Sequence, residues 1–193
     1  MNIVDTISNV TAFDWIAVLF LVGFFVVGFV QGTIRRLLGI ASIVFSFLLA
    51  ANLREPLGKF LAGYWTQWPR EYSYMLAFLF IFVVAGVVFA ILIQSFYKQT
   101  PLFAKWPIVD EALGGILGVV EGVLIIGAFI AIFDSFFKLP VTIGDNQIQV
   151  IKSINDAIDG SGTAALFRDT LLPGFVAIFG VILPSDVQSL YTR

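Results

Sequence analysis

One carboxylate stands alone inside a long apolar run. Glu121 is the only charged residue in Ala112–Phe133. A charge at membrane depth costs about 2.5–3.5 kcal/mol on insertion scales, so this residue is expected to be neutral, paired or facing water. Arg35 and Arg36, which follow an earlier apolar run, are the candidate partners. These residues could form an ion or proton site, or a structural ion pair that joins two hairpins. The structural ion pair is the preferred interpretation.

No other set of residues is typical of an active site or a cofactor site. The sequence has no cysteine and no histidine, which excludes disulfides, Cys/His zinc sites and a Ser-His-Asp triad. It contains no nucleophile–base pair, phosphate-binding loop or metal-ligand spacing. The formal net charge is −2 and the basic residues are scattered, which argues against nucleic acid. We therefore expect no enzyme activity, no catalytic residue, no cofactor, no metal and no nucleic-acid partner.

The elements that position these charges are apolar enough to lie in lipid. Hydrophobic residues make up 59% of the chain and charged residues 12%, far from the balance of a soluble domain. Tyr72–Tyr97 has no charged residue and is long enough to cross the roughly 30 Å hydrocarbon core as a helix. The other apolar runs are Trp15–Ile34, Leu37–Leu53 and Ala112–Phe133. We predict an all-α integral membrane protein, with four transmembrane helices as two hairpins in residues 1–138 and the lipid bilayer as a partner.

Residues 139–193 are predicted to form an amphipathic, interfacial tail. A helical stripe of isoleucines faces away from a polar side. The stripe comprises Ile148, Ile151, Ile154 and Ile158, and the polar side Asn146, Gln149, Lys152, Asn155, Asp156 and Asp159. Pro173 and Pro184 bracket an apolar run that is too short to span, so an interfacial or re-entrant segment is expected. Residues 54–71 are expected to be an aromatic connector at the membrane surface.

Glycines recur at helical spacing on two of the runs. Gly114, Gly118 and Gly122 form one series, and Gly28 and Gly32 form a second pair. Helices without side chains on one face can approach until their backbones nearly touch. Packing within the monomer is preferred over a homo-oligomer interface or a pore lining.

The carboxylates at the helix ends are given no role. Asp14 and Asp134 flank the first and fourth runs. Carboxylates at such positions are usually solvated, and we expect the same here.

The distribution of basic residues predicts an orientation. No Lys or Arg precedes Trp15, whereas Arg35 and Arg36 follow the first run. The positive-inside rule then places this turn in the cytoplasm and both termini outside. Three basic residues of the second connector favour the reverse: Arg54, Lys59 and Arg70. The N-out/C-out arrangement is the preferred prediction.

Two segments resemble the colicin V production (CvpA) family of bacterial inner-membrane proteins. Residues 28–35, Gly-Phe-Val-Gln-Gly-Thr-Ile-Arg, are similar to that family's Gly-Phe-x-x-Gly-x-x-Arg at the end of its first span. Residues 110–122 are similar to the glycine-spaced opening of its last span. The order of the spans also fits, so the resemblance covers nearly the whole chain.

Three positions depart from the family pattern. Arg36 stands where an acidic residue is usual, and Glu111 and Glu121 stand where basic residues are usual. Opposite reversals on two segments are what a swapped salt bridge would produce, so these segments are expected to touch.

The resemblance implies a cytoplasmic-membrane protein linked to toxin production or secretion and to envelope maintenance, without catalytic chemistry. Two alternatives stay open. One is a small oligomeric channel or transporter subunit, and the other is a membrane scaffold that recruits an envelope protein partner.

Overall fold

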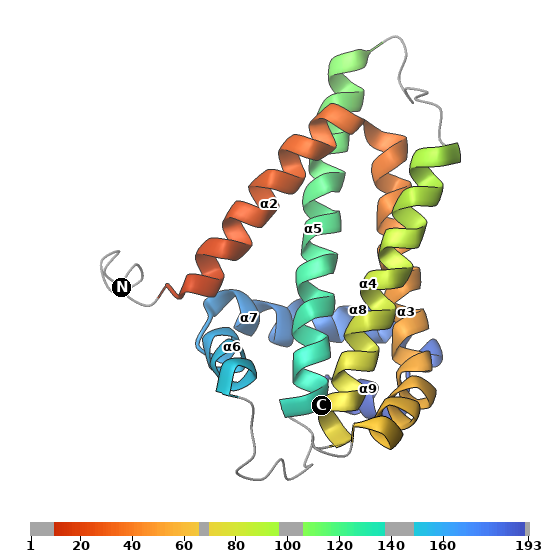
Figure 1. Ribbon diagram of the computed structural model, residues 1–193. Helices are drawn as coiled ribbons and strands as arrows, with labels where there is room; N and C mark the ends of the chain where they lie inside the picture. Colours follow the sequence, from red (N-terminus) through yellow and green to blue (C-terminus); the bar gives the residue numbers. More distant parts are fainter. Residues whose placement is uncertain (1–9, 66–69, 97–105, 138–148, 192–193) are drawn as a thin grey trace.

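The protein is a bundle of long helices with a helical tail across one side (Figure 1). The computed structural model describes residues 10–65, 70–96, 106–137 and 149–191. The long helices are α2 (Ala12–Gln31), α3 (Thr33–Tyr64), α4 (Arg70–Phe96) and α5 (Pro107–Phe137). Five helical stretches of the described residues are long and apolar enough to cross a membrane, by length and composition. The predicted all-α membrane class is confirmed.

The turn between α2 and α3 is made by one glycine. The N-terminus of α2 is closed by a capping box, in which the Thr11 hydroxyl accepts from the Asp14 backbone N–H at 3.3 Å. Gly32 has φ +78°, a conformation that favours glycine, so α3 can begin immediately at Thr33. Arg35 and Arg36 therefore lie in the first helical turn of α3.

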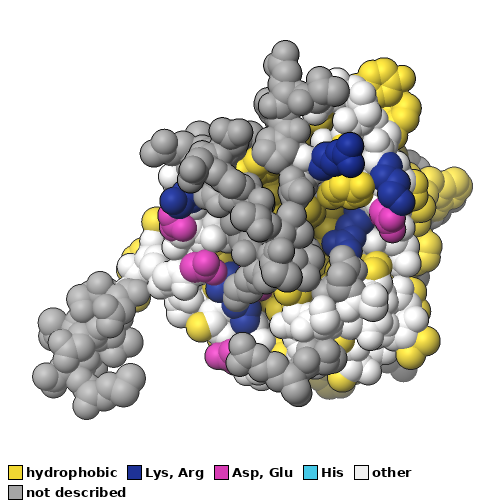
Figure 2. All heavy atoms as spheres, turned by 90° about the horizontal axis from the view of Figure 1, so that it is seen from below, with side chains coloured by type: hydrophobic (Ala, Val, Ile, Leu, Met, Phe, Trp, Pro, Cys, Tyr) yellow, Lys and Arg dark blue, Asp and Glu magenta, His cyan; other side chains and the backbone are white. Residues whose placement is uncertain are grey.

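The long helices pack mainly as α2 with α5 and α3 with α4, and α2 leans away from α3 (Figure 1). The first long helix therefore packs most closely with the fourth, and the second with the third. The two helices of each predicted hairpin, α2 with α3 and α4 with α5, contact each other much less. Seen from below, charged side chains gather on the lower end of the bundle and hydrophobic side chains lie towards its edges (Figure 2).

The predicted connector over residues 54–71 is wrong for its first part, because α3 continues as a helix to Tyr64. Pro56 lies inside this helix and is exposed. Arg54 is buried, with its guanidinium carbon 5.5 Å from the centroid of the Phe78 ring. Such a cation–π contact holds the charge against α4 instead of releasing it to a loop. A proline usually ends or kinks a helix, but here packing against α4 keeps the chain helical through Pro56.

The tail is more continuously helical than predicted. It contains α6 (Gln149–Asp159), α7 (Gly162–Leu166), the π-helical η1 (Phe167–Leu171), α8 (Leu172–Phe179), η2 (Gly180–Ile182) and α9 (Ser185–Ser189). Pro173 does not start a separate segment, because it occupies the first turn of α8 directly after the π-helical turn. A π turn inserts one extra residue and so accommodates the missing N–H. Figure 1 shows α7 and α8 lying crosswise to α5.

The predicted buried face of α6 is wrong in its phase. Ile158 is fully buried as expected, but Asn155 is only 8% exposed and Ile154 is 39% exposed. Residues three apart share one face of a helix, so Asn155 and Ile158 face the bundle together. The side-chain nitrogen of Asn155 donates to Asp159 at 3.2 Å. Ile148 and Asn146 lie outside the described residues, as does the side chain of Ile151.

Candidate functional site

The predicted glycines meet inside one chain, between α2 and α5. A Cβ atom on Gly114 would lie 2.5 Å from the backbone oxygen of Gly28 and 2.9 Å from the Cα atom of Gly32. Cβ atoms on Gly28 and Gly118 would also collide with the backbone of the facing helix. Gly122, one turn further along, faces side chains of α2. Small residues thus bring two helix backbones into direct contact, which is a source of stability in lipid.

Next to this contact, Arg36 donates from Nη1 to Oε2 of Glu121. The side chains are 6% and 12% exposed, so both charges are buried in the bundle. Gly39 makes room for the carboxylate, since a Cβ atom there would lie 2.6 Å from Glu121 Oε1. The Arg36 guanidinium also lies 5.6 Å from the centroid of the Phe24 ring. Of the two candidate arginines, the structure places Arg36 against Glu121.

The ion pair lines a polar cavity of about 260 Å³ to which all the long helices contribute. Its polar lining includes Arg35, Arg36, Gln31, Ser42 and Glu121. Arg35 is partly exposed and forms no ion pair within the described part of the chain. Two guanidinium groups and one carboxylate leave this cavity with a surplus of one positive charge.

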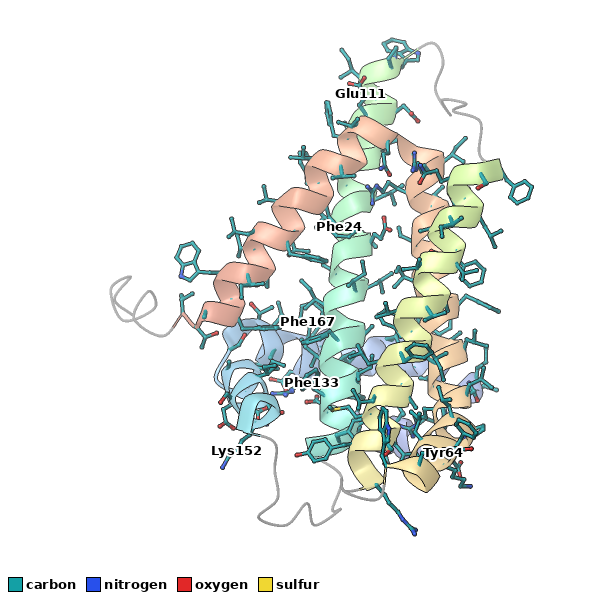
Figure 3. The ribbon with its side chains drawn as sticks, in the orientation of Figure 1. Phe24, Tyr64, Glu111, Phe133, Lys152 and Phe167 are labelled. Atoms are coloured by element: carbon teal, nitrogen blue, oxygen red, sulfur yellow. The ribbon has the colours of Figure 1, made fainter. Side chains whose placement is uncertain are left out.

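Glu111 lies apart from that cavity. It is partly exposed in the first turns of α5, near the helix's upper end, whereas Phe24 lines the cavity below (Figure 3). Among the described residues Glu111 has no ion-pair partner. The structure therefore brings Arg36 and Glu121 together and leaves Glu111 outside this pair.

A second charged cluster fastens the tail to the lower part of α5. Asp134 is fully buried and accepts from Arg168 Nε at 2.9 and 3.1 Å and from Tyr191 Oη at 2.9 Å. Arg168 Nη2 also bonds Asp134 at 2.5 Å and Asp159 at 2.7 Å. Burial raises the pKa of Tyr191 above its ordinary value, and the Asp134 carboxylate adds to this rise, so the phenol remains a donor. We name Asp134, Asp159, Arg168 and Tyr191 the tail clasp.

Asp14 makes a matching connection at the start of α2. Its carboxylate accepts from the Ser161 hydroxyl at 2.6 Å and from the Thr163 backbone N–H at 2.8 Å. The expectation that Asp14 and Asp134 are merely solvated is therefore wrong, because both bind tail residues. The spacing of Thr11 and Asp14 is a capping signal readable from the sequence. The pairing of Asp134 with Arg168 has no local signal.

In the described ranges no group of three or more Asp, Glu, His or Cys side chains could hold a metal ion. The fold and the site define a helical, multi-pass integral membrane protein, with one buried ion pair between α3 and α5 and another between α5 and the tail. The chain belongs to the family described as colicin V production protein, whose family model matches residues 13–169. The matched region includes Arg36, Glu121, Asp134 and Arg168. No curated protein and no solved structure matches the chain.

Proposed function

We propose that this chain is a non-enzymatic protein of the bacterial cytoplasmic membrane that supports production or secretion of a colicin V-type toxin and maintenance of the envelope. The observation that carries the proposal is the family match over residues 13–169. The geometry favours a supporting role, because Asp14, Glu121 and Asp134 each bond to groups of other helices or of the tail. Carboxylates engaged in this way help to hold the helices in one arrangement.

The test is complementation in a bacterium that secretes such a toxin and lacks its own family member. Extracellular toxin is measured by growth inhibition of a sensitive strain, and envelope integrity by leakage of a periplasmic enzyme. The chain is expected to restore both, whereas the packing variant Gly118→Ile is expected to restore neither. A well-expressed, membrane-inserted chain that changes neither reading would contradict the proposal.

The orientation with both termini outside is part of the same proposal. It rests on the N-terminus without basic residues and on Arg35 and Arg36 beside the first turn. Arg54, Lys59 and Arg70 lie towards the other end of the bundle and favour the reverse. The labelling experiment given in the Discussion decides between the two orientations.

The polar cavity favours a second candidate, a channel or transporter subunit. An ionisable residue at membrane depth beside a cavity is a default candidate for an ion path. Ion flux would be measured in proteoliposomes with the wild type, with Glu121→Gln, and with Glu55→Gln as a control from an exposed surface pair. Flux that only Glu121→Gln lowers would establish this candidate, and flux equal to empty liposomes would eliminate it.

A further inference from the structure

One face of α3 has a charged residue at its upper end and hydrophobic residues below it. Arg36, Ile40, Ile43, Val44 and Phe47 are spaced by three or four residues along the chain, apart from the adjacent pair, and so share a face. The upper end of this face lines the polar cavity. The lower end lines a second cavity of about 430 Å³ between α3, α5 and the η1–α8 segment of the tail.

The second cavity is apolar throughout. Its walls come from aliphatic and aromatic side chains and two glycines, without a charged residue. Phe167 and Leu172 of the tail form part of the wall, and Arg168 next to them is held by Asp134. The tail clasp therefore positions this side of the cavity. Ile43 lines both cavities, which makes them neighbours along the same helix face.

The charge of the upper cavity indicates the sign of its ligand. Arg36 is neutralised by Glu121, whereas Arg35 has no carboxylate partner among the described residues. Arg35 is three residues beyond the Gly32 turn, roughly 5 Å along the helix axis, which is close to the end of the span. A cation near the end of a span reaches the headgroup region, where the available anion is a lipid phosphate.

We propose that the two neighbouring cavities along α3 bind one anionic phospholipid, with its phosphate at Arg35 on the polar cavity and one acyl chain in the apolar cavity. The arginine fits the phosphate by charge and by its planar set of donors. The cavity below accepts a chain that continues from the headgroup in the direction of the bilayer centre. This site is independent of the toxin-related role and holds whether or not that role is correct.

The test is native mass spectrometry of the full chain in detergent, with phosphatidylglycerol and with phosphatidylcholine of identical acyl chains. We expect one retained phosphatidylglycerol per chain, at least fivefold more than phosphatidylcholine. Loss of one charge-assisted hydrogen bond lowers affinity roughly tenfold, so Arg35→Gln should reduce phosphatidylglycerol binding by about that factor. Arg70→Gln, at the exposed start of α4, should bind like the wild type.

A second variant tests the acyl-chain cavity. Ile43→Trp should obstruct the junction of the cavities and reduce retained phosphatidylglycerol, whereas Ile91→Trp on the exposed face of α4 should not. Each variant is first shown to have the thermal midpoint of the wild type, so that lost binding does not reflect unfolding; Val44→Phe replaces Ile43→Trp if the latter is unstable.

Three outcomes would overturn the lipid site. These are equal retention of the two lipids by the wild type, no effect of Arg35→Gln, and displacement of the lipid by soluble glycerol phosphate at equal concentration. The last outcome would show that the site recognises a phosphate group alone and does not need the acyl chain.

Discussion

The ion pair between Arg36 and Glu121 predicts a measurable coupling energy. Glu121→Gln leaves a guanidinium that is 6% exposed without its counter-charge. Removing one partner of a buried pair destabilises a protein by about 3–5 kcal/mol. The Gln amide oxygen still accepts a hydrogen bond and the polar cavity borders the pair, so we expect the low end, about 3 kcal/mol. Arg36→Gln also removes the contact with Phe24 and should cost at least as much.

The double variant should be less destabilised than the sum of the single variants. It leaves two neutral amides that can bond each other, and contacting residues show coupling of about 0.5–3 kcal/mol. Thermal unfolding in detergent, followed by the fluorescence of the 4 tryptophans, gives the required stabilities. A loss of about 3 kcal/mol corresponds to a shift of roughly 6–12 °C for a chain of this size.

Arg35 is the matched control, because it lines the same cavity without touching Glu121 in an ion pair. Arg35→Gln combined with Glu121→Gln should show a smaller coupling energy than the Arg36 cycle, because no ion pair joins these two residues. Additive losses in the Arg36 cycle would refute the pairing. If the coupling energy at Arg35 were as large as at Arg36, the effect would come from the overall electrostatic potential of the cavity and not from the specific Arg36–Glu121 contact.

Three further predictions concern the packing, the tail and the topology. Gly118→Ile should lower folded yield several-fold because its side chain would enter the backbone of α2, whereas Gly23→Ile, with open space around its Cβ atom, should match the wild type; equal yields would disprove the close contact. Asp134→Asn should destabilise the docked tail by about 3 kcal/mol and Tyr191→Phe by about 1 kcal/mol, measured by protease release of the tail. Because the pKa of Tyr191 is raised in the folded state, its contribution to tail docking is retained below the ordinary value of about 10 and is lost as the pH rises above it. A stability difference between the wild type and Tyr191→Phe that does not shrink above that pH would contradict this assignment. Asp156→Cys, which is exposed, should react with a membrane-impermeant thiol reagent in intact cells while the buried Asn155→Cys reacts slowly; labelling only after lysis would reverse the proposed orientation.

The spans could be predicted because lipid imposes a strong composition rule. The apolar runs of the sequence correspond to α2, the first part of α3, α4 and most of α5. The search for a partner of Glu121 could be narrowed to two adjacent arginines, because few cations are available near that depth. The choice between them depends on the direction of each side chain on α3, which follows only once Gly32 fixes where that helix begins.

Other features depend on contacts that are distant in sequence. The helix through Pro56 is held by packing on α4, and the helix through Pro173 is made possible by a π turn. Local propensity predicts breaks at both prolines, so both expectations were wrong. Asp134 and Arg168 are 34 residues apart, and no pattern links them. The face of α6 was misjudged because the isoleucine spacing put Ile154 on the buried face and Asn155 opposite it, whereas the helix packs through Asn155 and Ile158.

The positive surplus of the upper cavity does not depend on the polarity of its ion pair. In the family pattern that the sequence resembles, an acidic residue at the position of Arg36 would face a basic residue at the position of Glu121. Either polarity leaves the pair neutral and preserves the contact between α3 and α5. In this chain Arg35 lies beside the Gly32 turn and forms no ion pair among the described residues. The pair therefore accounts for helix association, and the neighbouring arginine is left available for an anion from the membrane surface.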